Sequence, residues 1–378
     1  MKKITFNVDS VLPQLAQVAS VVNSKNTIQI LDSVMVETFS DGSTAIFTTS
    51  DGEVTLQMKA AVESEEPTKF CVEAKTFLQT LRGLNGRVVT LTLTDESPTI
   101  EGKYDNGNFK LPYQDASMFP TPNKFDGEQE ERILDAQCFL RAVDMVKFSV
   151  ASDELRPQMN GVHVDFFADS MVAVASDGHK LAKFSDLSIT RTDDKVSEFI
   201  LPTKPSNLLT SIMQKAVGDV KITFDARMLS VSNSDWKLTT RLIEGRFPNY
   251  NSVIPKDLSI EAVVNKENIL GALKRVLPLG SSSSEMVVLN FRNNAVIVSA
   301  EDIDFSTSAS EMIPCEYSGE SLRIAFKGSF LAMSVQNIDD ELIVFSMSDP
   351  SRACVLRPFE QAGQTEFLSL LMPMMLND

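Results

Sequence analysis

The sequence predicts an α+β protein of three tandem domains, each with two helices packed on an antiparallel sheet. The first reason is an internal repeat: a short strand followed by leucines at helical spacing occurs three times along the 378 residues. Leu12, Leu140 and Leu270 hold the same place in these segments and lie 128 and 130 residues apart. Self-similarity at a nearly fixed step is the signature of a repeated structural unit. The segments are 6–18, 133–146 and 262–276.

The second reason is a further helix in each repeat. Leu78, Leu209 and Leu331 occupy its corresponding positions, with steps of 131 and 122 residues. The segments that hold them are 70–84, 199–213 and 323–338. The runs between the helices, such as VKITFDARMLSVSN, alternate apolar and polar residues between polar turns. This alternation is typical of antiparallel strands with one buried face.

The first helix of each repeat has a polar residue at its start. Asp9, Asp135 and Asn265 are predicted N-caps. A short polar side chain at this position accepts a hydrogen bond from the free N–H groups of the first turn.

Two stretches rich in proline, asparagine and charged residues separate the repeats, at 120–132 and 249–259. Such composition is typical of linkers. We therefore expect an N-terminal domain over 1–126, a middle domain over 127–254 and a C-terminal domain over 255–378.

The composition, 43% hydrophobic and 23% charged, is that of a soluble globular protein. No apolar run approaches the length of a membrane helix, so we expect no membrane span. Asn7 and Asp9 interrupt the stretch behind the N-terminal lysines, which argues against a signal peptide and for a cytoplasmic protein. The cysteines are scattered in apolar contexts and are predicted to be reduced core residues. They are Cys71, Cys138, Cys315 and Cys354.

Charge is divided unevenly along the chain. The net charge of −16, taken alone, argues against nucleic-acid binding. The six helical segments nevertheless sum to +7 and the rest of the chain to −23. Lysine and arginine are good helix formers, so solvated helix faces are one explanation. The consistent sign favours another, in which one helical surface faces a polyanion that the rest of the molecule repels.

A Ser-Asp-Gly turn occurs twice, at 50–52 and 176–178, and only the second copy continues into a histidine, His179. Asp-Gly supplies a tight turn in both. The chain has two histidines, His163 and His179, which are too few for a convincing metal site. We therefore expect neither a metal nor a cofactor.

Four motifs, in order on this repeat, resemble those of the bacterial DNA polymerase III β subunit family, the replicative sliding clamps. They are RPQMNGV (156–162), ASDGHKLA (175–182), LIEGRFPNY (242–250) and LMPMML (371–376). The resemblance covers essentially the whole chain and implies three DNA-clamp domains. In that family two subunits pair head to tail in a closed six-domain ring. Helices line the hole, sheets form the outer wall, and duplex DNA passes through.

The resemblance implies a processivity factor that tethers the replicative polymerase and has no catalytic activity of its own. The implied partners are a second copy of the chain, double-stranded DNA bound without sequence preference, the DNA polymerase III catalytic subunit, the clamp loader and other proteins with a clamp-binding motif. It also resolves the charge conflict, because a ring held by topology needs only weak phosphate contacts.

Motif matching then implies two sets of site residues. Those that would face DNA, each also explicable as an ordinary surface cation, are Lys25, Lys75, Arg82, Arg156 and Lys204. Those that would bind partner peptides in an adaptable apolar groove are Met159, Ser176, Gly178, His179, Lys180, Leu181, Pro248, Ser252, Val253, Leu370, Leu371, Met372, Pro373, Met374 and Leu376.

Several positions depart from the family pattern. Ser252 stands where many relatives have a basic residue, and Ser284 where an aromatic residue lines the third domain. Asn377 and Asp378 extend past the usual end. The subunit joint is expected between the first and third domains, at KYDNGNFKL (103–111) and the helix around Leu273.

Two other classes of protein are weighed against this one. Ser176, Asp177 and His179 invite a hydrolase, but neighbours on one turn cannot act together as nucleophile, base and orienting group. The chain also contains no G-x-S-x-G, P-loop or G-x-G-x-x-G motif. A repeat scaffold or peptide-binding module that does not bind DNA is the second class, and the charge division argues against it.

Overall fold

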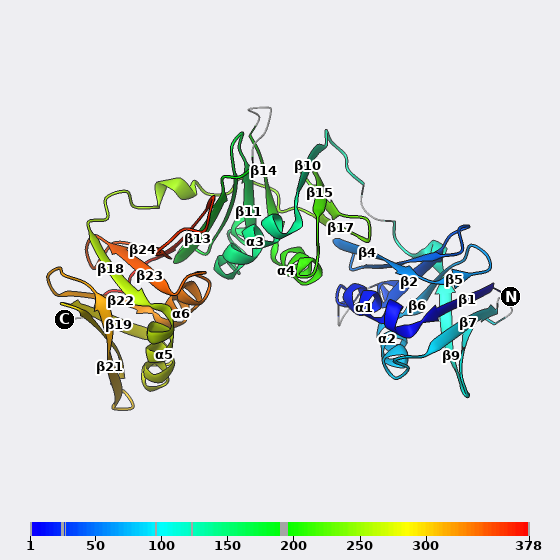
Figure 1. Ribbon diagram of the computed structural model, residues 1–378, viewed down its shortest axis with the longest axis horizontal. Helices are drawn as coiled ribbons and strands as arrows, with labels where there is room; N and C mark the ends of the chain where they lie inside the picture. The colour runs from blue at the N-terminus through cyan, green and yellow to red at the C-terminus, as the bar shows by residue number, and fades with distance from the viewer. Residues whose placement is uncertain are drawn as a thin grey trace. The chain divides into compact units, whose positions relative to one another are not determined.

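The computed structural model describes residues 2–23, 26, 28–94, 97–121, 124–189 and 196–376. The chain packs as two units, Met1–Gln137 with Asn207–Leu242 and Cys138–Ser206 with Ile243–Asp378. Each unit contains one continuous antiparallel sheet with helices packed on it (Figure 1). The prediction of an α+β fold with two helices per repeat is confirmed.

The sheet of the first unit has thirteen strands, in the order β10-β15-β16-β17-β4-β3-β2-β6-β9-β8-β7-β1-β5. Four strands from the middle of the chain join it where β17 pairs with β4, with Leu238 opposite Leu56. The helices α1 (Val8–Ala19) and α2 (Ala74–Arg82) contact each other and the sheet. The strands are β1 (Lys2–Asn7), β2 (Ser33–Thr38), β3 (Thr44–Ser50), β4 (Val54–Ala61), β5 (Glu63–Ser64), β6 (Lys69–Glu73), β7 (Val88–Thr94), β8 (Thr99–Tyr104), β9 (Gly107–Asp115), β10 (Glu130–Asp135), β15 (Asp219–Phe224), β16 (Met228–Ser232) and β17 (Trp236–Arg241).

The sheet of the second unit has twelve strands, in the order β14-β11-β12-β13-β25-β24-β23-β18-β21-β20-β19-β22. Here β13 pairs with β25, with Leu181 opposite Leu370. The helices α5 (Lys266–Val276) and α6 (Gly328–Gln336) contact each other and this sheet. The strands are β11 (Gly161–Phe166), β12 (Met171–Ser176), β13 (Lys180–Asp186), β14 (Ser197–Pro202), β18 (Ile260–Asn265), β19 (Met286–Arg292), β20 (Ala295–Asp302), β21 (Thr307–Glu316), β22 (Leu322–Lys327), β23 (Leu342–Met347), β24 (Cys354–Pro358) and β25 (Thr365–Leu371).

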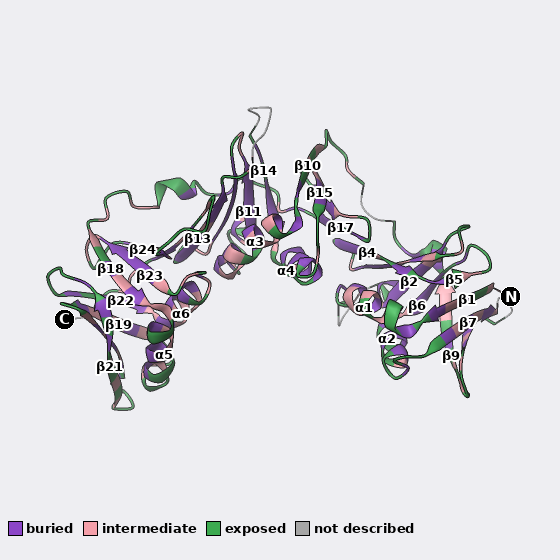
Figure 2. Cartoon of the chain, in the orientation of Figure 1, coloured by how far each residue is buried: buried purple, intermediate pink, exposed green. Residues whose placement is uncertain are grey.

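Helices α3 (Ala136–Val146) and α4 (Thr203–Met213) complete the set, and each begins in one unit and ends in the other. The leucines that define the second helix of each repeat, Leu78, Leu209 and Leu331, are all buried. Buried residues follow the helix faces that meet the sheets and cover most of the strands (Figure 2). The repeat in sequence is therefore a repeat of core positions.

The predicted N-caps hold for two of the three helices. The carboxylate of Asp135 accepts a hydrogen bond from the backbone N–H of Gln137 at 2.9 Å, and the side chain of Asn265 accepts one from Asn268 at 3.1 Å. The prediction for Asp9 is wrong, because α1 begins at Val8, two residues earlier than a cap at Asp9 would place it. Asn7 is the cap: its extended backbone precedes the helix and its Oδ1 accepts from the N–H of Asp9 at 2.9 Å.

All four cysteines are free thiols, and Cys71, Cys315 and Cys354 are buried. Burial raises the pKa of Cys71 and of Cys315 to about 12, so both are protonated at neutral pH. Cys138 is half-buried and its thiol donates to the carboxylate of Asp186 at 2.8 Å. None of the helices in the described part of the chain is long and apolar enough to cross a bilayer.

Candidate functional site

A groove of about 380 Å³ on the second unit is the strongest candidate for a binding site. Four parts of the chain form its walls: the short helical turn η4 (Pro157–Met159), the β12–β13 turn, the segment around η5 (Tyr250–Ser252) and the end of β25. It lies where the sheet passes from β13 to β25. The lining residues are Arg156, Met159, Ser176, Gly178, His179, Lys180, Leu181, Phe247, Pro248, Asn249, Tyr250, Val253, Leu370 and Met372.

The β12–β13 turn is stabilised by hydrogen bonds to side chains within the turn itself. The Asp177 carboxylate accepts hydrogen bonds from the backbone N–H groups of His179 and Lys180, both at 2.8 Å. The hydroxyl of Ser176 donates to the carbonyl of Lys180 at 2.9 Å. Gly178 has a φ of +89°, a left-handed conformation that glycine adopts without steric cost. The turn is thus fixed before any ligand arrives.

The first Ser-Asp-Gly turn has the same construction. The carboxylate of Asp51 accepts from the backbone N–H groups of Glu53 and Val54, at 2.9 and 2.7 Å, and Gly52 has a φ of +95°. The two copies therefore share a backbone, and the second differs in presenting His179 and Lys180 to a groove.

The two cations of the groove are paired with acids. The ammonium of Lys180 forms an ion pair with Asp177 and lies 4.4 Å from the centroid of the Phe330 ring. Burial alone would raise the pKa of Asp177, but hydrogen bonds from Lys180 and from backbone N–H groups hold it below its usual range. The guanidinium of Arg156 donates to Asp153 at 2.8 Å and keeps the pKa of that carboxyl low. Both cations of the groove are therefore already paired within the chain.

The floor of the groove is apolar. Phe247 and Tyr250 are buried in one cluster with Val174, Leu181 and Leu370. The Tyr250 hydroxyl donates to a buried carboxylate, that of Asp165, at 2.8 Å, so one edge of the floor is anchored. Burial raises the pKa of Tyr250, and the neighbouring carboxylate raises it further, so the phenol keeps its proton.

The structure brings together ten of the fifteen residues predicted for peptide binding. They are Met159, Ser176, Gly178, His179, Lys180, Leu181, Pro248, Val253, Leu370 and Met372. Leu371 is buried on β25 and points away from the lining, and Ser252 is exposed on η5 without lining the groove.

Three further predicted residues do not line the groove because of the course of the segment Met372–Leu376, here called the tail. The backbone N–H of Met372 donates to the carbonyl of His179, and that of Met374 to the carbonyl of Ala325, both at 2.8 Å. This course carries Pro373, Met374 and Leu376 out of the groove and into the lining of a second cavity of about 460 Å³, with Arg323 and Pro350.

Four lining residues were not predicted for this groove. Phe247, Asn249 and Tyr250 stand in the LIEGRFPNY motif, but 249–259 was interpreted as a linker. The aromatic rings of Phe247 and Tyr250 within a polar stretch were the signal that could have assigned these two residues. Arg156 was predicted to face DNA, whereas the structure places it at the groove, paired with Asp153.

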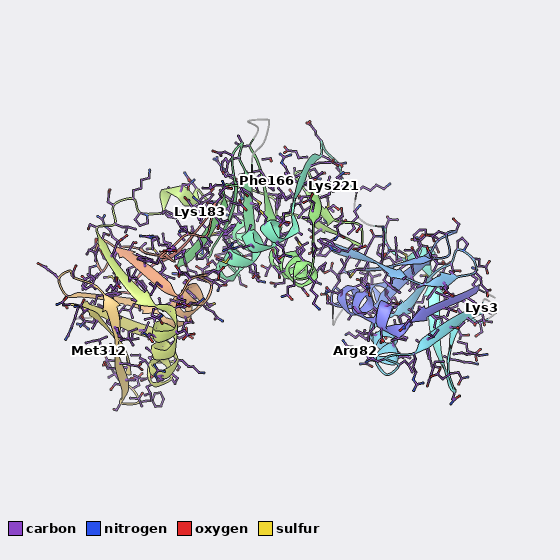
Figure 3. All side chains as sticks on the ribbon, viewed as in Figure 1. Lys3, Arg82, Phe166, Lys183, Lys221 and Met312 are labelled. Atoms are coloured by element: carbon purple, nitrogen blue, oxygen red, sulfur yellow. The ribbon has the colours of Figure 1, made fainter. Side chains whose placement is uncertain are left out.

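Three of the other four cations predicted to face DNA lie on helices. Lys75 and Arg82 are exposed on α2, and with Gln79 they form a stripe along one side of it. Figure 3 labels Arg82 at the end of this helix. Lys204 is half-buried in the first turn of α4. Lys25 lies outside the described residues.

Repeated two-helix domains on antiparallel sheets, with a peptide-sized apolar groove at a sheet seam, define a clamp-type α+β protein. Models of the three domains of the DNA polymerase III beta subunit match the chain in order: the N-terminal domain over residues 2–123, the central domain over 133–249 and the C-terminal domain over 251–375. The chain belongs to the DNA polymerase III beta subunit family, the sliding clamps of DNA replication.

Full-length relatives and solved structures agree with this assignment. The beta sliding clamp of Pseudomonas aeruginosa is 25% identical over 374 residues, covering 98% of this chain and 99% of the relative. That of Treponema pallidum is 24% identical over 375 residues, covering 98% and 99%. The fold is similar to a crystal structure of the P. aeruginosa DNA polymerase sliding clamp with ligand, with a TM-score of 0.91, 23% identity and 100% of both chains covered. It is also similar to the DNA polymerase III beta subunit of Thermotoga maritima, with a TM-score of 0.87, 22% identity and the same coverage.

Proposed function

We propose that two copies of this chain close head to tail into a ring around duplex DNA, and that the groove holds short peptide segments of a replicative polymerase and other partners. The single observation that carries the proposal is the groove, formed by ten residues that motif matching selects from four separate parts of the chain. The ring would supply processivity by topology, so the protein itself needs no catalytic group.

Parts of strands β9 and β21 pair with a neighbour on one side only, and these half-open edges support the assembly. Residues 107–112 of β9 pair with β8 on one side only, and the pairing with β6 begins at Tyr113. Residues 307–314 of β21 likewise pair with β20 alone, before Cys315 meets β18. Open edges seek partners, and a twofold pair that joins one edge to the other removes both. Leu273 itself is buried, so α5 would offer its exposed cations to the joint rather than this leucine.

The exposed stripe of α2 supports contact with DNA. Lys75 and Arg82 can meet phosphates without reading bases, so binding is insensitive to sequence and sensitive to salt. Lys204 on α4 is proposed for the same surface. Weak contacts suffice here, because the closed ring prevents dissociation while it permits sliding.

We assign the domains to residues 1–126, 127–254 and 255–378, in keeping with the spans of the three family models. The middle domain contributes strands to both sheets, which is why the chain packs as two units. The further partners we propose are the DNA polymerase III catalytic subunit and the clamp loader, and the proposed location is the cytoplasm, where bacterial DNA is replicated.

Loading onto nicked circular DNA tests this function. With a clamp loader and ATP, the protein should remain on circular DNA through gel filtration and leave it after the circle is cut. Retention that does not depend on circularity would contradict encirclement. A peptide-binding scaffold, the alternative, would bind labelled peptide in the groove and show no retention on either DNA.

A further inference from the structure

A charged cluster lies directly beneath the groove floor, on strand β11. His163 and Asp165 are two residues apart and so point to the same face of the strand. Asp165 stands opposite Glu198 of β14 in the antiparallel register. Two carboxylates in direct cross-strand register repel each other unless a positive charge or a proton donor lies between them. His163 is the group in that position.

The imidazole lies between the carboxylates and the two aromatic rings that line the groove. Its Nε2 is 3.1 Å from Oδ1 of Asp165 and 3.7 Å from Oε2 of Glu198. The ring is 3% exposed and stacks on Phe247, with centroids 4.7 Å apart and planes 8° from parallel. The centroid of the Tyr250 ring is 6.0 Å from that of the imidazole, and the Tyr250 hydroxyl donates a hydrogen bond to Oδ2 of Asp165. One histidine therefore joins the acid pair to both aromatic residues of the floor.

Titratable side chains from three strands and from η5 surround His163. Asp165 faces it from its own strand, Glu198 from β14 and the phenol of Tyr250 from η5. Strand β13 contributes Lys183, whose ammonium is 6.0 Å from the Tyr250 ring. The neighbouring β12 residues, Val172 and Val174, are apolar.

The carboxylates beside Nε2 attract a positive imidazole, whereas the surroundings of Nδ1 oppose a second ring proton. Carboxylates accept hydrogen bonds, so Nε2 must carry the proton that faces them. Nδ1 is buried and has no hydrogen-bond partner among the described residues. In the neutral ring this atom is a bare acceptor, whereas protonation would make it a buried, unpaired donor beside Phe247. Leaving a buried donor unpaired costs free energy, so protonation would favour movement of the ring out of its stacked position.

A metal ion is the other occupant that these ligand atoms could hold, since they lie within 4.8 Å of one another. A histidine that binds a metal through one nitrogen almost always donates from the other to a carbonyl or carboxylate. The unpartnered Nδ1 does not fit that pattern, so the cluster is better explained by a proton.

We propose that His163 is a positioning residue whose neutral form holds Phe247 and Tyr250 in the peptide-binding arrangement, so that acidification weakens the groove. This rests on the proposed peptide-binding function. The effect reaches the ligand through Phe247 and Tyr250, which line the groove, and not through His163 itself.

The first test measures peptide affinity against pH. Fluorescence anisotropy with a labelled glutamine-and-leucine-containing peptide should show a Kd that rises about fivefold from about pH 7.5 to about pH 5.5, the range in which imidazoles titrate. H163L should abolish this dependence. H179Q removes the chain's other histidine, which lies exposed at the groove, and should retain the dependence even if affinity falls. A pH dependence lost in H179Q and kept in H163L would overturn the proposal.

The second test needs no variant of the cluster, and its first measurement needs no bound peptide. In wild-type protein, NMR of the imidazole Cε1–H and of the Met159 and Met372 methyl groups should show one shared titration midpoint. Peptide should lower that midpoint by about 0.7 pH, because linkage is reciprocal and log of fivefold is about 0.7. Groove methyls that do not follow His163 would refute the coupling. If zinc chloride moves the midpoint and EDTA restores it, the cluster is a metal site and the proposed proton switch is wrong.

The two tests distinguish failure of the proposed peptide-binding function from failure of the coupling between His163 and the groove. If wild-type protein binds no peptide at any pH, the proposed function fails. The shared midpoint of His163 and the groove methyls still decides whether the floor responds to protonation.

Discussion

Truncating Met372 to alanine should weaken peptide binding about fivefold. The side chain is 46% exposed beside the groove, while its backbone N–H bonds to His179, a contact that alanine keeps. Fully burying a methionine side chain contributes about 1.5–3 kcal/mol. A bound peptide would cover roughly the exposed half, or about 1 kcal/mol, which is a factor of about five in Kd.

Fluorescence anisotropy with a labelled peptide measures this change, and Met375→Ala is the matched control. Met375 belongs to the same tail and is 82% exposed, but it lines the second cavity. Its truncation should change Kd by less than about twofold. Retention on circular DNA should be unaffected in both variants, because neither residue belongs to the surface proposed for DNA.

Two results would refute this reasoning. If Met375→Ala weakens binding as much as Met372→Ala, the peptide occupies the second cavity rather than the groove. If Met372→Ala loses DNA retention while it remains a dimer, the two surfaces are not independent.

Four more expectations follow from the same geometry. Gly178→Ala should lower the melting temperature and weaken peptide binding, since an alanine at φ +89° costs about 1–2 kcal/mol and its Cβ would lie 3.1 Å from Nη1 of Arg156; an unchanged Kd would contradict the rigid turn. Asp177 has a lowered folded pKa, so its stabilisation is present above its unfolded pKa and lost as pH falls through the folded one. The difference in melting temperature between wild type and Asp177→Asn should therefore be largest near neutral pH and shrink on acidification. Met312→Lys, on the half-open β21 and labelled in Figure 3, places a charge on an edge residue that is 65% exposed and should shift light scattering towards monomer. Lys75→Glu with Arg82→Glu should reduce DNA retention equally for unrelated sequences, with peptide affinity kept; a sequence-dependent loss would count against phosphate contacts.

Much of the fold could be predicted because its determinants are local. Helical spacing around Leu78, Leu209 and Leu331 selects core positions whatever the surrounding sheet does. The turn at 176–180 could be predicted equally well, since the hydrogen bonds to the Asp177 carboxylate and from the Gly178 N–H all stay within these five residues. These features need no knowledge of distant strands.

What the sequence did not predict depends on long-range pairing. Every residue of β11 is buried, so its alternating sequence could not indicate that His163 lies under Phe247, a residue 84 positions later. Arg156 is similar: its partner Asp153 is local, but its place at the groove is set by the approach of Gly178. The middle domain's division between two sheets follows from the β17–β4 and β13–β25 pairings, which no local pattern reports.

The tail couples the groove to the second cavity of the same unit. Leu370 and Met372 form one wall, and the backbone bonds of Met372 and Met374 to His179 and Ala325 fix that wall in place. A shift of the tail at either bond would therefore change the wall of the groove and the lining of the second cavity together.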